Sequence, residues 1–331
     1  MILHLNKDTP QTIINSYVEN TPSFVNHKVE YIQLVNSSSN KKVPKELNPF
    51  LIDEFIFNDD IQLASLKYKD YKEIPIKHIS IGRKSTTFPL IMGPCSIEST
   101  QQINEVGNFL TSNELSCIRA GAFKPRTSPY SFQGLENKGL NILKLAAKKH
   151  NLITFSEAKN AEHIQELIEQ ADVVQVGTKS MYDQSLLKAL SKTNKPVLLK
   201  RGFSSTLQEF IQAAEFILSG GNENVILCER GIRTFETKTR FTLDLCSVAW
   251  IKKHINLPIV IDPSHALGDR YGIIDLSKAA VAMGVDGLLI EVHPNPDKAL
   301  SDAQQQIDFK TAEKLIKQIQ PLIELNNKRL C

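Results

Sequence analysis

The chain has 331 residues, of which 41% are hydrophobic and 23% are charged, and its formal net charge at pH 7 is +3. This balance is typical of a globular protein that can bury a core, and it excludes a disordered, collagen-like or coiled-coil chain. The charge excess is too small for a nucleic-acid-binding surface and no long run of lysine and arginine occurs, so no nucleic-acid partner is expected.

The five cysteines are odd in number, widely spread and never spaced as C-x-x-C: Cys95, Cys117, Cys228, Cys246 and Cys331. This usage indicates a reducing compartment and no disulfide framework. No apolar run approaches 18 residues, and the N-terminus lacks a basic segment followed by a long apolar core. We therefore expect a cytoplasmic protein that has no membrane partner.

The first 88 residues predict a small α+β unit. Residues 1–6 and 28–35 are typical of strands, and residues 9–20 of a helix with Thr9 as its N-cap and Pro10 at the first helical position. Residues 49–57 and 61–69 complete the unit. We predict an N-terminal domain over residues 1–80 and a second domain over residues 81–331, joined near residues 79–87.

The rest of the chain alternates short apolar runs with segments of helical periodicity. The apolar runs are rich in aliphatic and β-branched residues, as buried parallel strands are; they cover residues 89–97, 116–123, 151–158, 172–178, 196–202, 224–231, 257–265 and 286–294. The helical segments cover residues 101–112, 141–150, 162–170, 184–192, 207–219, 276–284 and 309–325. Eight β/α units in succession predict an α/β protein with a closed (β/α)8 TIM barrel. No G-x-G-x-x-G sequence follows a strand, which disfavours a dinucleotide-binding sheet.

A polar or ionisable residue stands at or just beyond the end of every predicted barrel strand. In chain order these residues are Cys95, Arg119 with Lys124, Glu157, Lys179, Lys200, Glu229 with Arg230, Asp262 with His265, and Glu291 with His293. The carboxyl ends of barrel strands meet at one mouth, where active sites are built. A single residue of this kind is equally well explained as an ordinary loop charge, whereas eight at one rim indicate a site.

The residues at this rim divide into two chemical sets. The cationic set would repel itself without an anionic ligand, which indicates more than one phosphate, or a phosphate and a carboxylate; it consists of Arg119, Lys124, Arg126, Lys179, Lys200 and Arg230. The second set combines a thiol, an imidazole and two carboxylates, namely Cys95, His265, Glu291 and Asp302. It predicts a divalent-metal site without choosing among Mn, Fe, Co and Zn.

Six ordered motifs resemble 3-deoxy-D-arabino-heptulosonate 7-phosphate (DAHP) synthase: "GPCSIES", "RAGAFKPRTSPYSFQG", "KPVLLKRGF", "ILCERGIRTFE", "DPSHA" and "EVHPNPDKALSD". The most similar type is the short microbial form, sometimes called Iβ, which carries a small ferredoxin-like N-terminal domain. The resemblance covers residues 89 to the C-terminal helix and, weakly, the first domain.

The resemblance implies a reaction and a set of roles. The family condenses phosphoenolpyruvate with erythrose 4-phosphate and releases phosphate, the entry step of the shikimate pathway. By motif, the metal ligands would be Cys95, His265, Glu291 and Asp302. Phosphoenolpyruvate would be held by Arg119, Lys179, Lys200 and Arg230, and the erythrose phosphate by Lys124, Pro125, Arg126 and Thr127.

The resemblance also implies catalytic residues. Lys124, which would lie between the two substrates, is the predicted proton donor, and His265 is counted as catalytic through the metal. Glu157 and Asp262 are predicted in a water or proton relay, the alternative being that they orient cationic side chains. At Lys179 the chain departs from the family, which usually has Gly-Ala-Arg where this sequence has "GTK". Lysine keeps the charge but loses the bidentate fork, so that weaker binding of phosphoenolpyruvate or a rearranged neighbour is expected.

Three alternatives stay open at this point. The first is the sister reaction, in which arabinose 5-phosphate gives 3-deoxy-D-manno-octulosonate (KDO) 8-phosphate; the second is a paralogue that uses another phosphorylated aldehyde; the third is a degenerate regulatory or scaffold chain. The N-terminal domain resembles the family's regulatory module, which implies an aromatic amino acid effector, Phe or Tyr, and a homo-oligomer, most simply a tetramer. The alternative is a domain that serves only oligomer contacts.

Overall fold

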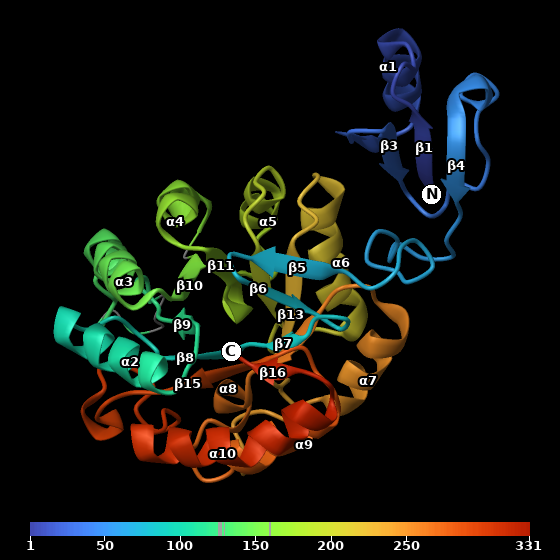
Figure 1. Cartoon of the computed structure of the whole chain (residues 1–331). Helices are drawn as coiled ribbons and strands as arrows, with labels where there is room; N and C mark the ends of the chain where they lie inside the picture. Colours follow the sequence, from blue (N-terminus) through green and yellow to red (C-terminus); the bar gives the residue numbers. More distant parts are fainter. Residues whose placement is uncertain (125–127, 129, 159) are drawn as a thin grey trace.

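The computed structural model describes residues 1–124, 128, 130–158 and 160–331. A small antiparallel sheet with one helix stands beside a closed barrel of eight parallel strands, as Figure 1 shows. The predicted fold class, a TIM barrel preceded by a small α+β domain, is confirmed.

The N-terminal domain has the strand order β2-β3-β1-β4 with every pair antiparallel. Its elements are β1 (Ile2–Asn6), α1 (Gln11–Asn20), β2 (Ser23–His27), β3 (Tyr31–Asn36), η1 (Asn48–Phe50) and β4 (Leu51–Phe55). This is the order of a ferredoxin-like β-α-β-β-α-β fold in which the second helix is reduced to the single turn η1. The polar segment of residues 37–42 therefore lies in the connection from β3 to this shortened helix.

Two local expectations for this domain were wrong, and one strand was missed. The helix begins at Gln11 with Pro10 in the N-cap position, and the Thr9 hydroxyl donates backward to Asn6 O (2.5 Å) instead of capping the helix. Strand β2 was missed because it is a half-exposed edge strand with no apolar alternation. Residues 61–69 form turns instead of a sheet element, and they pair with the end of α7 (Leu245–His254) through Leu66 N and His254 O (2.9 Å).

The barrel closes in the order β8 to β15, with β15 paired to β8. Its strands are β8 (Leu90–Gly93), β9 (Cys117–Arg119), β10 (Ile153–Ala158), β11 (Val173–Val176), β12 (Val197–Lys200), β13 (Val225–Glu229), β14 (Ile259–Ile261) and β15 (Leu288–Glu291). Each strand lies inside one of the eight predicted runs. The strands are short and buried on both faces, which explains why their sequences are apolar without alternation.

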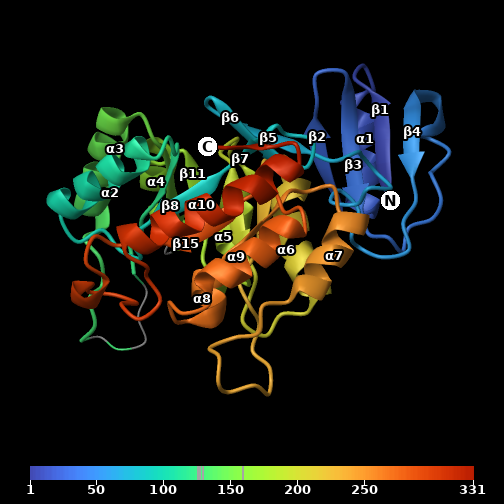
Figure 2. The ribbon, with the colours of Figure 1, turned by 60° about the horizontal axis from the view of Figure 1, so that its bottom comes forward.

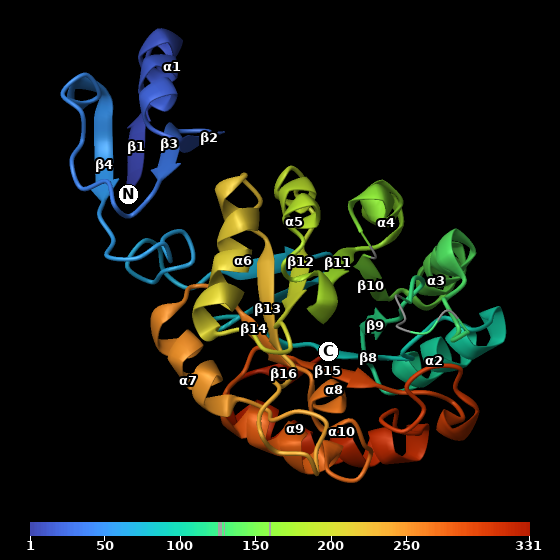
Figure 3. The same cartoon turned by 180° about the vertical axis from the view of Figure 1, so that it is seen from behind.

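A ring of helices surrounds the barrel (Figure 3). Its members are α2 (Thr100–Ser112), α3 (Glu136–His150), α4 (Ile164–Gln170), α5 (Gln184–Ser191), α6 (Leu207–Ser219), α7, α9 (Ile273–Ala282) and α10 (Phe309–Leu325); the shorter elements are α8 (Pro263–Leu267), η2 (Ala161–His163), η3 (Thr178–Ser180) and η4 (Pro296–Lys298). Helix α7 was missed from the sequence because its apolar residues do not form one clear stripe, and Trp250 points partly to solvent. No helix in the described part of the chain is long and apolar enough to cross a membrane.

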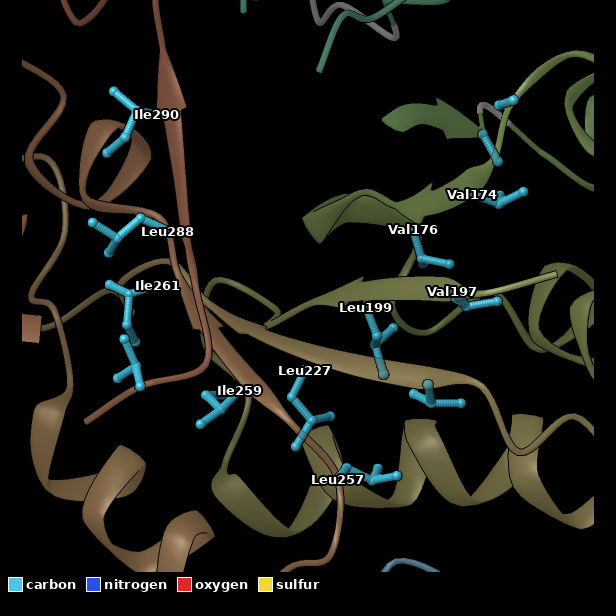
Figure 4. Packing of buried hydrophobic residues seen from close by; sticks show 14 of the residues in the cluster. Val174, Val176, Val197, Leu199, Leu227, Leu257, Ile259, Ile261, Leu288 and Ile290 are labelled. Carbon is cyan, nitrogen blue, oxygen red and sulfur yellow. The ribbon is translucent and has the colours of Figure 1, made fainter. Parts of the chain in front are cut away.

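Two apolar layers hold the barrel together. The outer layer lies between strands and helices, and Figure 4 shows part of it, with side chains from β11 to β15 such as Val176, Leu199 and Ile261. The inner layer fills the barrel and includes Phe155 and Leu198. Residues Ile2 and Val35 of the N-terminal sheet join the outer layer, so the small domain shares a core with the barrel.

The floor of the barrel is closed by a hairpin of β5 (Glu73–Ile76) and β6 (Ile79–Gly82), visible across the barrel in Figure 1. Its four isoleucines, Ile74, Ile76, Ile79 and Ile81, belong to the inner layer of the barrel. The C-terminal strand β16 (Arg329–Leu330) pairs with β7 (Thr87–Phe88) at the same end. The predicted domain division at residue 80 stays a prediction. Figure 2 shows that the long loop after β13 lies at the opposite end, which is the mouth.

Candidate active site

Three predicted metal ligands meet at the mouth. One donor atom each from Cys95, Glu291 and Asp302 lies within 4.8 Å of the others. Cys95 follows β8, Glu291 ends β15, and Asp302 comes from the loop after η4, so the fold joins positions more than 200 residues apart. Cys95 and Glu291 are buried. Burial, followed by the neighbouring Glu291, raises the pKa of the Cys95 thiol to about 12.

His265, the fourth predicted ligand, borders this cluster. Its Nε2 lies 3.4 Å from Glu291 Oε1, and its Nδ1 lies 2.7 Å from Asp262 Oδ2, at ion-pair distance but without hydrogen-bond alignment. A carboxylate behind one ring nitrogen orients the other toward a metal, which is the usual arrangement of ligating histidines. This thiol, imidazole and pair of carboxylates therefore fit a divalent ion, and Cys95, His265, Glu291 and Asp302 would hold it.

Two cations flank the ligand cluster. Arg119 forms a buried ion pair with Glu291 Oε1 and donates to Pro94 O (3.1 Å). Although burial opposes the charge, Glu291 raises the pKa of Arg119. Lys124 Nζ lies 3.0 Å from Cys95 Sγ, and its pKa is raised in spite of burial because Cys95 and Glu157 are close. Lys124 is therefore an ammonium ion at the edge of the ligand cluster.

Two adjacent residues at the end of β12 turn to opposite sides. Lys200 Nζ pairs with Asp262 Oδ2 at 2.8 Å, and Arg201 Nη1 pairs with Glu229 Oε2 at 2.8 Å and with Asp244 Oδ2 at 3.0 Å. Burial favours the neutral form of Asp262, but His265 and Lys200 hold its pKa well below the ordinary value. Asp262 is thus charged, and it contacts both the Lys200 ammonium and the imidazole of His265.

Arg230 is buried against two aromatic rings. Its guanidinium lies 4.2 Å from the centroid of Phe241 and 5.3 Å from that of Phe203. Burial lowers the pKa of Arg230, and within the described residues no carboxylate lies at ion-pair distance from it. A buried arginine with stacked rings and no carboxylate partner is suited to an anionic ligand.

Glu157 and Lys179 lie on the same side of the mouth. Glu157 Oε2 accepts from Gln175 Nε2 (2.7 Å), and a Cβ at Gly177 would stand 2.3 Å from Glu157 Oε1, so any other residue at position 177 would displace this carboxylate. Lys179 lies on η3, directly after β11. The glycine in "GTK" therefore has a structural purpose, separate from the unusual lysine.

These side chains surround a cavity of about 120 Å³, lined by Lys124, Glu157, Thr178, Lys179, Lys200, Phe203, Arg230, Arg240, His265 and Asp302. Larger cavities occur elsewhere, among them one of about 490 Å³ at the barrel floor. The chemistry of its lining, and not its volume, marks the cavity at the mouth as the site.

The structure brings together most of the predicted site. Glu157, Lys179, Lys200 and Arg230 line the cavity with Lys124, whereas Arg119 lies below it, engaged with Glu291. The predicted phosphate-gripping residues Pro125, Arg126 and Thr127 lie outside the described residues. The base of their loop is closed by Lys124 N, which donates to Gln133 O (2.9 Å).

Several residues of the site were missed from the sequence. Arg240 and Phe203 line the cavity, and Arg201 supports the end of β12. Arg201 stands next to Lys200, and the alternation of strand side chains would have given it a separate role. Arg240 lies in the polar segment after β13, where nothing in the sequence distinguishes it from an ordinary loop charge.

Fold and site together define a (β/α)8-barrel enzyme whose mouth joins several cations to a cluster of Cys, His, Glu and Asp side chains that fits a divalent ion. A model of the DAHP synthetase I family matches residues 64–325, and the chain therefore belongs to this family. The predicted resemblance is confirmed, as is the prediction of an enzyme.

The chain is 46% identical over 237 residues to the phospho-2-dehydro-3-deoxyheptonate aldolase of Thermotoga maritima, a match that covers 72% of this chain and 70% of that protein. The crystal structure of a T. maritima protein of that name, also titled DAHP synthase, superposes with a TM-score of 0.80 and 36% identity over 100% of this chain and 99% of that one. A 2-dehydro-3-deoxyphosphooctonate aldolase of Fusobacterium nucleatum is 30% identical over 270 residues, covering 75% of this chain and 94% of that protein.

Proposed function

We propose that the protein condenses phosphoenolpyruvate with D-erythrose 4-phosphate and water to give 3-deoxy-D-arabino-heptulosonate 7-phosphate and phosphate, in a metal-dependent reaction that opens the shikimate pathway. The main observation in support is the cavity in which Lys124, Lys200 and Arg230 face the cluster of Cys95, Glu291 and Asp302. The higher identity to the heptonate aldolase than to the octonate aldolase supports the choice of aldose.

In this reaction the cations hold the substrates. Lys200 and Arg230 are buried and aimed at the cavity, and with Lys179 they would take the phosphate and carboxylate of phosphoenolpyruvate. Arg119 contributes beneath them while it keeps Glu291 charged and in place. The erythrose phosphate would be held by the loop that Lys124 begins, including Pro125, Arg126 and Thr127.

A divalent ion, Mn, Fe, Co or Zn, would supply Lewis-acid polarisation of the aldehyde when bound by Cys95, His265, Glu291 and Asp302. The enol carbon of phosphoenolpyruvate then forms a bond to the aldehyde carbon, and the Lys124 ammonium donates its proton to the aldehyde oxygen. Water adds to the adjacent carbon of phosphoenolpyruvate, the one that carries the phosphate ester, and the resulting hemiketal phosphate expels phosphate. Glu157 lines the cavity and is the proposed proton acceptor for that water. Asp262 is the proposed second member of the relay, and it also holds Lys200 in place through their ion pair.

Phosphate release tests this proposal. With phosphoenolpyruvate and erythrose 4-phosphate we expect turnover that a chelator abolishes and that Mn, Fe, Co or Zn restores. With arabinose 5-phosphate we expect kcat/KM to be lower by about 10²-fold or more, because a site fitted to one phosphorylated aldose loses transition-state contacts with a longer one. Preference for arabinose 5-phosphate would support the octulosonate reaction, and no turnover with any aldose phosphate would support the scaffold alternative.

We also propose regulation through the N-terminal domain, with Phe or Tyr as effector. A cavity of about 330 Å³ lies between this domain and α6, where Phe24 and Phe216 could enclose an aromatic ring and Asp60 could meet an ammonium group. We expect Phe or Tyr to inhibit the enzyme, with saturation at millimolar concentration. If neither amino acid changes the activity, the domain serves oligomer contacts alone.

We also propose a homo-oligomer, most simply a tetramer. Light scattering checks this state, and the mass of a monomer would contradict it. The cytoplasmic location stays a prediction.

A further inference from the structure

The segment of residues 301–307 runs between the ends of β8 and β15. Ile307 N donates to Glu291 O (2.9 Å), and His293 N donates to Ile307 O (3.0 Å). Ile307 therefore pairs with the chain directly after Glu291, the last residue of β15. Two consecutive glutamines in it, Gln305 and Gln306, are 2% and 0% exposed. Buried amides need partners for both their oxygen and their nitrogen, and here one partner of each amide belongs to the ligand cluster.

Gln305 holds the carboxylate of Glu291. Its Nε2 donates to Glu291 Oε2 at 2.6 Å, whereas Arg119 and His265 approach the other oxygen, Oε1. The Gln305 Oε1 atom accepts from Arg240 Nη1 at 2.6 Å. One amide therefore links a cavity-lining arginine to a ligand carboxylate.

Gln306 holds the backbone at the two remaining members of the cluster. Its Oε1 accepts from Cys95 N at 2.9 Å, and its Nε2 donates to Ser301 O at 2.8 Å, one residue before Asp302. The hydroxyls of Ser96 and Ser301 lie 2.7 Å apart and tie the same two segments together. Gln305 N also donates to Asp302 O (3.2 Å), which fixes the turn that carries this carboxylate.

We propose that Gln305 and Gln306, the glutamine pair, are positioning residues that set the separations of Cys95, Glu291 and Asp302 for metal binding. The proposal rests on the metal dependence of the proposed function. A neutral amide serves this purpose because it satisfies a carboxylate and a backbone amide without adding a charge that competes for the ion. Through Gln305 the pair also links Arg240 to Glu291, so an anion bound by Arg240 changes metal affinity, and the metal changes anion affinity by the same factor.

Replacing Gln305 by methionine tests the pair, because it removes both hydrogen bonds at nearly constant volume. We expect Mn²⁺ to bind the metal-free variant about 10–100-fold more weakly than it binds the wild-type protein, by calorimetry or by the electron paramagnetic resonance of free Mn²⁺. Gln304→Met is the matched control, since Gln304 is exposed and bonds to Asp269 away from the cluster (2.9 Å). Its Mn²⁺ affinity should equal that of the wild type.

Two further readouts separate positioning from general damage. In the wild type, phosphoenolpyruvate should raise Mn²⁺ affinity. In Gln305→Met the ratio of the Mn²⁺ affinities with and without phosphoenolpyruvate should fall to near one. In Gln306→Met the Co²⁺–thiolate charge-transfer absorption from Cys95 should weaken or shift, and this variant decides the question if Gln305→Met does not fold. Mn²⁺ affinity within twofold of wild type in a folded Gln305→Met or Gln306→Met variant would overturn the proposal. So would a wild-type protein that binds neither ion. Because these titrations need no turnover, a failure of the proposed aldol reaction is seen separately.

Discussion

Lys124→Met is expected to lower kcat by about 10²–10⁴-fold, the usual contribution of a positioned proton donor. The Lys124 ammonium lies 3.0 Å from Cys95 Sγ and lines the cavity, and its raised pKa keeps it protonated at neutral pH. Methionine keeps most of the length of the side chain but has no proton to give to the aldehyde oxygen. Steady-state phosphate release with both substrates measures the effect.

Lys138→Met provides the matched control, because Lys138 is an exposed lysine at the start of α3. It should leave kcat and KM unchanged. If Lys124→Met raised KM while kcat stayed within threefold, Lys124 would be a binding residue for the substrates, and the proton would have to come from another group.

Cys95→Ser should remove both the metal and the activity. A hydroxyl is a far poorer ligand than a thiolate for these ions, and Cys95 is fully buried in a cluster whose donor atoms lie within 4.8 Å of one another. We expect the metal content after gel filtration to fall below about one tenth of the wild-type value and activity to fall by at least about 10²-fold. The thermal unfolding of the metal-free protein should change little, since the change in volume is small.

Cys246→Ser is the control for Cys95→Ser, because Cys246 is an exposed thiol at the start of α7. Metal content is measured by mass spectrometry of the purified proteins, and activity by phosphate release. Full activity and full metal content in Cys95→Ser would remove Cys95 from the site.

The barrel could be predicted from sequence because its strands follow a local rule. Parallel strands covered on both faces are continuous apolar runs, and all eight runs contain a barrel strand. The edge strand β2 and helix α7 escaped prediction because half-exposed elements lack a strong pattern. Their stability comes from contacts with distant residues, such as Asn26 Nδ2 donating to Ser219 O (2.9 Å).

The site was predictable where chemistry and topology coincide. The ends of the barrel strands lie at the mouth, so Lys200, Asp262 and Glu291 could be placed there without coordinates. The supporting contacts could not, because Gln305 and Arg240 lie in segments of no regular structure. Their pairing joins positions 65 residues apart in sequence. No periodicity encodes such a contact.

The hairpin under the barrel limits how this protein can be shortened. A chain that begins at residue 81 loses Ile74, Ile76 and Ile79, three of the four isoleucines that seal the floor. Burial of each is worth about 1.5–3 kcal/mol, so the loss approaches the whole stability of an ordinary domain, about 5–15 kcal/mol. A barrel separated from its N-terminal sheet should therefore keep residues 73–82, and any natural fusion or loss of that sheet should leave the hairpin with the catalytic half.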